Sequence, residues 1–333
     1  IMFFDVDSFK GVNDTLGHET GDMLLQAVAK KVKSYLRSND IIARLGGDEF
    51  LIMLPNITEQ SIVIDIAESI IEGMKEPFTI NEWDVPAGIS IGIASAKEAE
   101  FDINTFISNA DIAMYTSKEK GKGAYTIFHH KMLEDNKRKV QVANLISHAI
   151  AQNEFELFYQ LKMSNTGEAQ GLEALIRWQS KELGFVSPGE FIPIAEQAGK
   201  IKAITLWVIT QVFKDMQMLK QLMGNNVLVS MNLSSHDLKD HNFIHTVKSK
   251  LLEHSVDISN IQFEITESSY LENFENANQF FNQVKVMGGS IALDDFGTGY
   301  SSLSYLTKIE IDTLKIDRMF VNQYASSAKD TAV

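Results

Sequence analysis

The sequence contains no cysteine and is poor in positive charge. Without cysteine, the chain has no disulfide framework and no thiolate chemistry. Its 30 lysines and arginines are outnumbered by 44 acids, and the net charge of −14 argues against a general binder of nucleic acid or anionic membranes. No apolar run approaches the roughly 18 residues of a membrane-spanning helix, and no signal peptide is visible. The length of 333 residues favours two domains.

The first half is organised around residues 44–50, which read Arg-Leu-Gly-Gly-Asp-Glu-Phe between apolar residues 41–43 and 51–54. This pattern predicts two strands joined by a tight Gly-Gly turn that presents Asp48 and Glu49 at its tip. Glycines at the turn would let a bulky anionic ligand approach the backbone. The alternative is a surface hairpin that carries two solvated acids.

An apolar run at residues 1–4 predicts a buried strand that ends in Asp5 and Asp7, which alternation places on one side. Two acids at a strand end commonly hold a divalent cation against a phosphate, although a solvated strand end is the alternative. The polar, glycine-rich stretch 9–22 predicts a loop and a helix start. Helices are then expected at 23–36, 59–74 and 104–120, and strands at 85–94 and 125–128. Since the chain opens inside a core strand, we expect it to be a piece of a longer protein.

Three ordered motifs in this half resemble the GGDEF family of diguanylate cyclases. They are Asp5-Val6-Asp7-x-Phe9-Lys10, Asn13-Asp14-x-x-Gly17-His18-x-x-Gly21-Asp22 and Arg44-x-Gly46-Gly47-Asp48-Glu49-Phe50. The resemblance implies a polymerase-palm-like βαββαβ core that condenses two GTP into cyclic di-GMP.

The same resemblance assigns roles to individual residues. It implies that Asp5 and Asp48 bind two Mg²⁺ (or Mn²⁺) ions, with the catalytic Glu49 beside them. It implies guanine contacts from Asn13 and Asp22. The implied phosphate contacts are Lys10, Lys118 and Lys122. The family usually has Arg-Asn where this chain has Lys122-Gly123, and lysine loses the bidentate geometry of arginine.

Arg37 and Asp40 precede the predicted hairpin. The family often carries Arg-x-x-Asp there as a product-binding inhibitory site, and the alternative is a helix-terminal arginine followed by a turn aspartate. The family's upstream helix and its Leu-Thr-Gly-Leu-type segment are absent from the sequence. We therefore expect residues 1–130 to form an N-terminally truncated GGDEF domain.

From residue 155 onward, strands and helices alternate. Strands are expected at 155–163, 172–178, 227–232, 262–266, 290–294 and 313–316, and helices between them include 201–222, 246–252 and 276–286. This alternation is typical of a (β/α) barrel. Residues 131–147 are expected to form a linker helix, and residues 148–333 the second domain. The predicted fold class is thus α/β and α+β, in two domains.

Polar side chains gather at the expected C-terminal ends of these strands, where barrel enzymes build their sites. They are Glu173, Arg177, Asn232, Glu264, Glu267, Asp294, Asp295 and Lys315. Any one of them could be structural, but five acids and an asparagine on neighbouring strand ends suit hard divalent cations.

The motifs of this half resemble the EAL family, whose members open cyclic di-GMP to the linear dinucleotide pGpG. They are Tyr159-Gln160, Glu173-Ala174-Leu175-x-Arg177-Trp178, Phe191-Ile192-Pro193-x-Ala195-Glu196, Asn232-Leu233-Ser234, Glu264-x-Thr266-Glu267-Ser268, the run 293–301 and Leu314-Lys315-Ile316-Asp317.

The EAL resemblance also assigns roles. The implied ligands of two Mg²⁺ (or Mn²⁺) ions are Glu173, Asn232, Glu264, Asp294 and Asp295, with Asp294 and Glu173 also counted as catalytic. It implies that Lys315 lies beside the attacking water. Gln160 and Arg177 would hold the dinucleotide. Glu267 would brace the loop 295–301, which the family couples to dimerisation.

Two departures from the EAL pattern stand out. Leu161 replaces the usual proline after Gln160. The family also needs two more strands after Ile316, one ending in a glutamate and one with a Gln-Gly pair. We therefore expect a TIM-like barrel that is C-terminally truncated.

Together the motifs predict a cyclic di-GMP turnover protein with a cyclase domain followed by a phosphodiesterase domain. The alternative is that one or both domains are catalytically silent and sense GTP or cyclic di-GMP. We expect GTP and cyclic di-GMP as ligands, a homodimer, no nucleic-acid partner, and an upstream sensor domain outside this chain. The catalytic domains are expected in the cytoplasm, with any membrane attachment through a preceding region.

Overall fold

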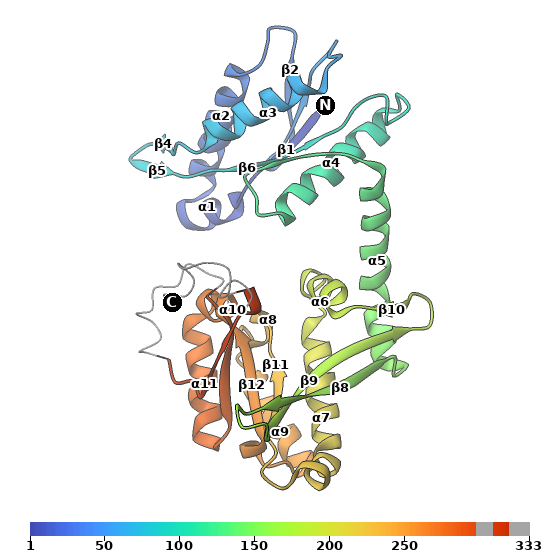
Figure 1. Ribbon diagram of the computed structural model, residues 1–333. Coiled ribbons are helices and arrows are strands. Elements are labelled where there is room, and N and C mark those ends of the chain that lie inside the picture. The colour runs from blue at the N-terminus through green and yellow to red at the C-terminus, as the bar shows by residue number, and fades with distance from the viewer. Residues whose placement is uncertain (298–308, 320–333) are drawn as a thin grey trace. The chain divides into compact units, whose positions relative to one another are not determined.

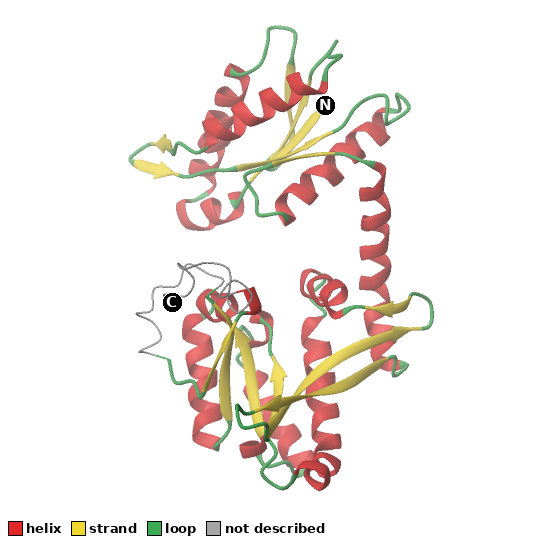
Figure 2. Cartoon of the chain, in the orientation of Figure 1, coloured by secondary structure: helices red, strands yellow, loops and turns green. Residues whose placement is uncertain are grey.

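A computed structural model of the chain describes residues 1–297 and 309–319 (Figures 1 and 2). The chain divides into two compact units, Ile1–Lys139 and Val140–Val333. Within the described residues, no helix is both long enough and apolar enough to cross a membrane.

The first unit is built on a five-stranded sheet with the order β2–β3–β1–β6–β7. The central strand β1 runs antiparallel to β3 and β6, and β7 joins the edge parallel to β6. The bounds are β1 (Met2–Val6), β2 (Ile41–Gly46), β3 (Glu49–Met53), β6 (Ile89–Ile93) and β7 (Tyr125–Ile127). The predicted hairpin is confirmed, because β2 pairs antiparallel with β3 across the Gly47-Asp48 turn.

The alternation of β1 sends its side chains into two separate cores. Met2 and Phe4 pack with α2 (His18–Ser34) and α3 (Gln60–Met74) on one face of the sheet. Phe3 packs with α4 (Ile103–Glu119) on the other face. Each large apolar side chain buried in this way contributes about 1.5–3 kcal/mol to folding. Because Asp5 follows the parity of Phe3, its side chain emerges on the face that α4 covers.

Two stretches of the first unit differ from the prediction. The stretch 9–22 forms α1 (Phe9–Leu16) and the start of α2, and the chain turns between these helices at Gly17, whose φ is 85°. The predicted strand 85–94 is two strands. β5 (Trp83–Val85) pairs with β4 (Phe78–Ile80) in a separate hairpin, whereas β6 begins only after Pro86. Proline has no N–H to donate to a sheet, which explains the interruption.

A single helix, α5 (His130–Ala151), contains the predicted linker segment. Met132 belongs to the α4 core of the first unit. Val142 and Ile146 belong to the core of the second unit. The division between the two units falls within α5, between Lys139 and Val140.

The second unit contains a seven-stranded sheet with the order β10–β9–β11–β12–β13–β14, and β8 pairs with β9. The strands are β8 (Phe155–Met163), β9 (Ala169–Ser180), β10 (Gly184–Val186), β11 (Val229–Asn232), β12 (Ile261–Thr266), β13 (Ser290–Phe296) and β14 (Thr313–Ile316). All six predicted strands are present. The short β10 was not predicted, nor was the antiparallel direction of β8 relative to β9. The pairs β9–β11, β11–β12, β12–β13 and β13–β14 are parallel, whereas β10 pairs antiparallel with β9.

One apolar core joins this sheet to its helices. They are α6 (Pro188–Gln197), α7 (Ile201–Met223), α8 (Ser235–Leu238), α9 (Phe243–His254), the short η1 (Ile258–Asn260), α10 (Glu267–Glu272) and α11 (Phe274–Met287). Phe155, Trp178 and Phe191 form an aromatic cluster within the core, with ring centroids 5.3–5.6 Å apart. Because strands β9 and β11 to β14 run parallel, polar side chains near the C-terminal ends of β11 to β14 lie at one edge, beside Glu173 from the middle of the longer β9.

Candidate functional site

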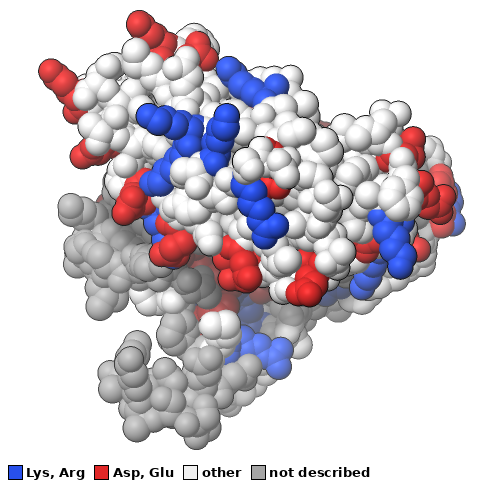
Figure 3. Space-filling model, turned by 90° about the horizontal axis from the view of Figure 1, so that it is seen from above, with Lys and Arg blue, Asp and Glu red and all other residues white. Residues whose placement is uncertain are grey.

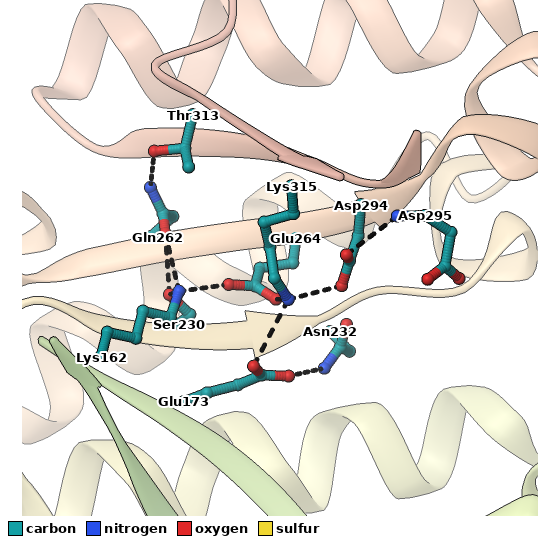
Figure 4. A network of polar contacts seen from close by, with 10 residues as sticks. All are labelled: Lys162, Glu173, Ser230, Asn232, Gln262, Glu264, Asp294, Asp295, Thr313 and Lys315. Atoms are coloured by element: carbon teal, nitrogen blue, oxygen red, sulfur yellow. Dashed lines mark hydrogen bonds and ion pairs between the residues drawn. The ribbon is translucent and has the colours of Figure 1, made fainter. Parts of the chain in front are cut away.

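Three carboxylates converge at this edge of the second unit (Figure 4). Glu173 comes from β9, Glu264 from β12 and Asp294 from β13. One oxygen of each lies within 4.8 Å of an oxygen of the others. We call these three residues the carboxylate cluster. Three carboxylates this close repel one another when ionised, so a cation among them would stabilise the cluster.

The side chain of Lys315, on β14, supplies a positive charge inside the carboxylate cluster. Its Nζ lies 2.5 Å from Glu264 Oε2, 2.5 Å from Asp294 Oδ2 and 3.3 Å from Glu173 Oε2. Burial lowers the pKa of Lys315, but the hydrogen bonds to Asp294 and Glu264 outweigh it and raise that pKa above its usual value. The ammonium is therefore charged and lies between the carboxylates where a metal ion would bind them.

Glu264 is the best-buried member of the carboxylate cluster, with no exposed surface. Lys162 Nζ donates to its Oε1 at 2.5 Å, and Lys315 donates to its Oε2. Burial alone would raise the pKa of Glu264, but the hydrogen bonds from Lys162 and Lys315 together lower it below its ordinary value. Glu264 is therefore ionised, which a metal ligand must be.

Lys162 belongs to a polar layer that sequence reasoning missed. Its Nζ also contacts Ser230 Oγ and Gln262 Oε1, and Gln262 Nε2 donates to Thr313 Oγ1 at 3.0 Å. A signal was present in the sequence. Ser230, Gln262 and Thr313 each precede a predicted site residue by two positions, so they line the same face of their strands one step deeper. Lys162 instead comes two positions after its site residue, Gln160, because β8 runs antiparallel to β9 and its later residues lie deeper.

Asn232 and Asp295 differ in their relation to the carboxylate cluster. Asn232 Nδ2 donates to Glu173 Oε1 at 3.1 Å. Asp295 has a positive φ of 53°, and its carboxylate points away from Lys315 in Figure 4. Its backbone N–H donates to Asp294 Oδ1 at 2.9 Å. Burial, followed by the nearby charges of Asp294 and Asp317, raises the pKa of Asp295. The structure therefore does not place Asp295 in the cluster, and its predicted role as a ligand stays a prediction.

The residues predicted to hold the dinucleotide lie on the β8–β9 ladder. Gln160 pairs directly with Glu173 in the antiparallel register, so the two side chains share a face. The Arg177 guanidinium lies 5.5 Å from the ring centroid of Phe158, and it donates to the carbonyl of Ile176 at 2.8 Å. An arginine and an exposed aromatic ring thus lie next to each other near Gln160.

Glu267 is fully buried at the start of α10. Its Oε2 accepts a hydrogen bond of 2.8 Å from the backbone N–H of Gly297. The contact ties α10 to the loop that follows β13. The rest of the predicted loop, residues 298–301, lies outside the described residues.

The corresponding site of the first unit comprises Asp5, Asp48 and Glu49, which we call the hairpin site. Asp5 on β1 pairs with Glu49 on β3. Gly47 in the turn has a φ of 50°, which favours glycine. The turn is fixed by a 2.8 Å hydrogen bond from Arg44 Nε to the Gly47 carbonyl. A second bond of 3.3 Å joins the Val6 N–H to the Asp48 carbonyl and places the turn beside the end of β1.

Asp5 is the buried acid of the hairpin site, with 8% of its surface exposed. Lys118, at the end of α4, lies 2.7 Å from its Oδ1. Burial raises the pKa of Asp5 and is opposed by Lys118, and the charges of Asp48 and Asp7 raise it further. Among residues 1–297 and 309–319, only the carboxylate cluster of the second unit brings three acids together.

The other predicted ligand contacts of the first unit are spread around the hairpin site. Asn13 Oδ1 is buried without a hydrogen-bond partner, and a Cβ at Gly21 would lie 2.0 Å from it. Asp22 forms a long ion pair of 3.9 Å with Arg44. Lys122 Nζ lies 3.3 Å from Ser8 Oγ. Lys10 is exposed on α1.

Asp7, which alternation predicted on the same side of the strand as Asp5, makes hydrogen bonds within the protein. Its carboxylate accepts hydrogen bonds from Ser90 Oγ at 2.8 Å and from the Gly123 N–H at 3.0 Å. It thereby fixes the glycine-flanked Lys122 turn next to the end of β1.

Arg37 and Asp40 form a local turn. Asp40 Oδ2 accepts from the Arg37 N–H at 2.8 Å, and the Asp40 N–H donates to the Arg37 carbonyl at 3.0 Å. The Arg37 residue is exposed. The turn is compatible with both interpretations of the motif, so product binding stays a prediction.

Acidic and basic side chains are interspersed on the face of the molecule that Figure 3 shows. The whole chain carries a net charge of −14. An anionic ligand such as a nucleotide is therefore attracted by local lysines and arginines and not by the overall field.

Comparison with known proteins matches two family models to the chain. The model of the diguanylate cyclase GGDEF domain matches residues 1–124, and that of the EAL domain matches residues 143–333.

Two similar relatives cover nearly all of the chain. The bifunctional diguanylate cyclase/cyclic di-GMP phosphodiesterase MucR of Pseudomonas aeruginosa is 34% identical over 334 residues, covering 100% of this chain and 49% of MucR. The cyclic di-GMP phosphodiesterase PdeR of Escherichia coli is 37% identical over 321 residues, covering 96% of this chain and 48% of PdeR. The chain thus spans about half the length of these relatives.

Two solved structures are also similar to this chain. The PaMucR phosphodiesterase in complex with c-di-GMP is 34% identical, covers 58% of this chain and 78% of its own, and has a TM-score of 0.54. The S helix–GGDEF–EAL segment of Vibrio cholerae LapD, bound to c-di-GMP, has a TM-score of 0.63 and covers 99% of this chain and 78% of its own. At 21% identity, the second comparison supports the fold alone.

Proposed function

The chain belongs to the EAL family and carries a GGDEF domain ahead of its EAL domain, and on this premise we propose that it makes and degrades cyclic di-GMP. The GGDEF unit condenses two GTP into cyclic di-GMP, and the EAL unit hydrolyses cyclic di-GMP to linear pGpG. Residues 131–147 connect the two. The observation that carries the proposal is the carboxylate cluster, because it brings three carboxylate side chains from neighbouring parallel strands close enough together to share a cation.

The side chains of the carboxylate cluster fit divalent cations. Carboxylate and amide oxygens are the ligands that Mg²⁺ and Mn²⁺ prefer, and a cation, the Lys315 ammonium, already lies between all three acids. We propose as ligands of two ions the residues Glu173, Asn232, Glu264, Asp294 and Asp295. When bound, such ions would neutralise phosphate charge and activate the attacking water.

The remaining residues of the EAL unit bind and orient. Arg177 would bind a phosphate of the dinucleotide through its guanidinium. Gln160, whose side chain is on the same face as Glu173, would also bind the dinucleotide. Lys315, once released from the carboxylates, would orient the water through its N–H groups and stabilise the charge that develops on the phosphate. Glu267 keeps the loop after β13 in place through its bond to Gly297.

In the GGDEF unit, we propose that Asp5 and Asp48 hold two cations against the GTP triphosphate, with Glu49 beside them. Their oxygen side chains fit this role, since Mg²⁺ is typically bound by one or two carboxylates together with substrate phosphates.

Substrate recognition in this unit is assigned to residues around the hairpin site. Asn13 and Asp22 would bind guanine, and Asn13 would have to turn its amide away from Gly21 to do so, since its Oδ1 is buried there. The phosphate contacts would be Lys10, Lys118 and Lys122. Arg37 and Asp40 would bind the product and inhibit synthesis. We expect a homodimer, since the reaction joins two bound GTP molecules.

A second candidate function applies to the GGDEF unit alone. Within the described residues, its acids do not converge as those of the EAL unit do. This observation favours a catalytically silent GTP sensor that regulates the phosphodiesterase.

Product analysis of the full-length protein tests these proposals. GTP and cyclic di-GMP are supplied separately with Mg²⁺ or Mn²⁺, and products are separated by ion-pair chromatography. We expect cyclic di-GMP from GTP and pGpG from cyclic di-GMP. GTP binding without turnover, together with GTP-dependent pGpG formation, would support the sensor instead. Cyclic di-GMP that is bound but never hydrolysed would contradict the phosphodiesterase assignment.

A further inference from the structure

We propose that Lys162 is a positioning residue that prepares Glu264 for cation binding from a polar layer beneath the carboxylate cluster. The proposal rests on the proposed function of that cluster. It adds a residue on β8, a strand from which only Gln160 is assigned to the site.

Lys162 and Lys315 contact opposite oxygens of one buried carboxylate (Figure 4). Lys162 Nζ lies 2.5 Å from Glu264 Oε1, and Lys315 Nζ lies 2.5 Å from Oε2. Lys315 also contacts Glu173 and Asp294. Within the described residues, Glu264 is the only acid of the cluster that Lys162 contacts. A cation entering the cluster therefore replaces Lys315, whereas Lys162 stays paired with Glu264.

The local sequence explains how a lysine of β8 reaches β12. In the β8–β9 register, Lys162 lies opposite Gly171, which offers no side chain to block its path. A Cβ at Gly171 would lie 2.7 Å from the Leu228 carbonyl oxygen. The lysine chain therefore passes over β9 and reaches Ser230 on β11 and Gln262 on β12.

The polar layer fixes the ammonium in place. Ser230 and Gln262 are buried, and Ser230 Oγ donates to Gln262 Oε1 at 2.8 Å. Gln262 is held in turn by Thr313 on β14. Hydrogen-bonded partners of this kind orient ligand side chains, and their removal typically lowers metal affinity about 10- to 100-fold.

The direction of the effect follows from competition between cations. Without Lys162, Glu264 depends on Lys315 alone, so Lys315 becomes harder to displace. The unpaired Oε1 also frees the carboxylate to rotate. Both consequences weaken cation binding and outweigh the repulsion that Lys162 exerts on an incoming ion, because Lys162 lies on the opposite side of Glu264 from Lys315, whose place the ion takes (Figure 4).

Mn²⁺ binding to the full-length protein, followed by electron paramagnetic resonance of the free ion, tests the proposal. All proteins carry Asp5→Asn, which suppresses binding at the hairpin site. We expect Lys162→Met to raise the Kd about 10- to 100-fold. Lys162→Gln should have a smaller effect, and Lys162→Arg should restore binding. The matched control is Lys202→Met, which removes another ion-paired lysine of the same unit and should leave the Kd unchanged. Unchanged binding by Lys162→Met would overturn the proposal.

Two further measurements separate the possible failures. Glu173→Ala should abolish the Mn²⁺ binding assigned to the cluster. If the parent protein binds no Mn²⁺ there, the proposed function falls and this proposal falls with it. If the neutral variants of Lys162 do not fold, ¹⁵N NMR of the lysine ammonium groups in the unmodified protein decides. Mg²⁺ should shift the Lys315 resonance and leave that of Lys162 in place, and release of Lys162 instead would overturn the proposal.

Discussion

Both units place a lysine ammonium against acids that we propose as cation ligands, but the surroundings of these contacts differ. In the EAL unit, Lys315 lies among three convergent carboxylates with a hydrogen-bonded layer beneath them. In the GGDEF unit, Lys118 contacts Asp5, while Asp48 lies in a hairpin turn. The first arrangement holds its geometry through contacts within the protein. The second supplies few protein oxygens, so a cation bound there would depend on substrate phosphates and water for its remaining ligands.

The largest expected effect is the loss of cyclic di-GMP hydrolysis, without loss of cyclic di-GMP synthesis, when a proposed metal ligand of the EAL unit is removed. Glu173→Ala in the full-length protein should reduce cyclic di-GMP hydrolysis by at least about 100-fold, since loss of a ligand exceeds the loss of a supporting residue. Cyclic di-GMP synthesis should remain within about twofold. Product chromatography measures both reactions. Hydrolysis that survives the change would remove Glu173 from the site.

The reciprocal change tests the GGDEF side. Asp48→Asn keeps the size of the side chain but removes its charge, and it should reduce synthesis by about 100-fold or more while leaving hydrolysis intact. If synthesis is undiminished, the turn carries no catalytic ligand. If neither the parent protein nor Asp48→Asn makes cyclic di-GMP, the test is whether GTP stimulates cyclic di-GMP hydrolysis by the parent, as the sensor function requires.

Stability can be changed in one unit alone. A Cβ at Gly92 would lie 1.9 Å from the Ala110 carbonyl oxygen and 2.2 Å from the Met114 nitrogen, both backbone atoms of α4. Gly92→Ala should therefore destabilise the GGDEF unit by about 3 kcal/mol or more, seen as an earlier thermal transition of that unit. Gly11→Ala is the matched control, because a Cβ there meets nothing within 4 Å. Equal melting curves for the two variants would show that α4 can move aside.

Product inhibition should respond to a surface change. In a Glu173→Ala background, added cyclic di-GMP should inhibit synthesis, and Arg37→Ala should raise the inhibitory concentration about tenfold, as expected for one charge-assisted contact. Lys33→Ala removes another exposed cation of the same helix region and serves as the control. If Arg37→Ala and the control give the same inhibition, the motif is only a turn.

The smallest expected effect is the pH dependence of stability, because the pKa of buried Glu264 is lowered and that of buried Asp5 is raised. The lowered pKa of Glu264 gives the EAL unit stability that is present above 4.5 and is lost as the pH falls through the lowered value. The raised pKa of Asp5 has the opposite result, because its ionisation costs the GGDEF unit stability as the pH rises above 3.8. Melting curves of metal-free protein between pH 3.5 and 6 should show differences of a few degrees.

Neutral variants provide the comparison for this pH series. The advantage of the parent over Glu264→Gln should shrink on acidification. Any advantage of Asp5→Asn over the parent should also shrink on acidification, since the parent becomes neutral at Asp5. Melting temperatures that change in parallel for all three proteins would contradict both assignments.

The sequence predicted those features that depend on local pattern. Asp294 was found because it ends an apolar run, and Glu264 because it is an acid within a predicted strand that neighbours it. The β2–β3 hairpin was found because two glycines interrupt two apolar runs. The orientation of Asp295 could not be found in this way, since a positive φ at one residue does not alter the pattern of the strand before it.

Lys162 was missed for a different reason. Its significance depends on β8 running antiparallel, which places residues after Gln160 deeper in the sheet, whereas in the parallel strands the deeper residues come before the site. Strand direction follows from long-range pairing that a single strand's sequence does not encode. The short strands β4, β5 and β10 were likewise missed or merged with neighbours, because three residues show little periodicity. The equally short β7 was predicted from its apolar and β-branched residues.

The position of Lys315 also bears on how the EAL unit matures. In many small metal-binding domains the ligands assemble only when the ion binds, so that metal binding and folding are coupled. In this chain the Lys315 ammonium already pairs with the three carboxylates, so folding of the EAL unit would not depend on a bound metal ion. A chelator should therefore silence the EAL unit while leaving it folded, and addition of the ion should restore it without a refolding step.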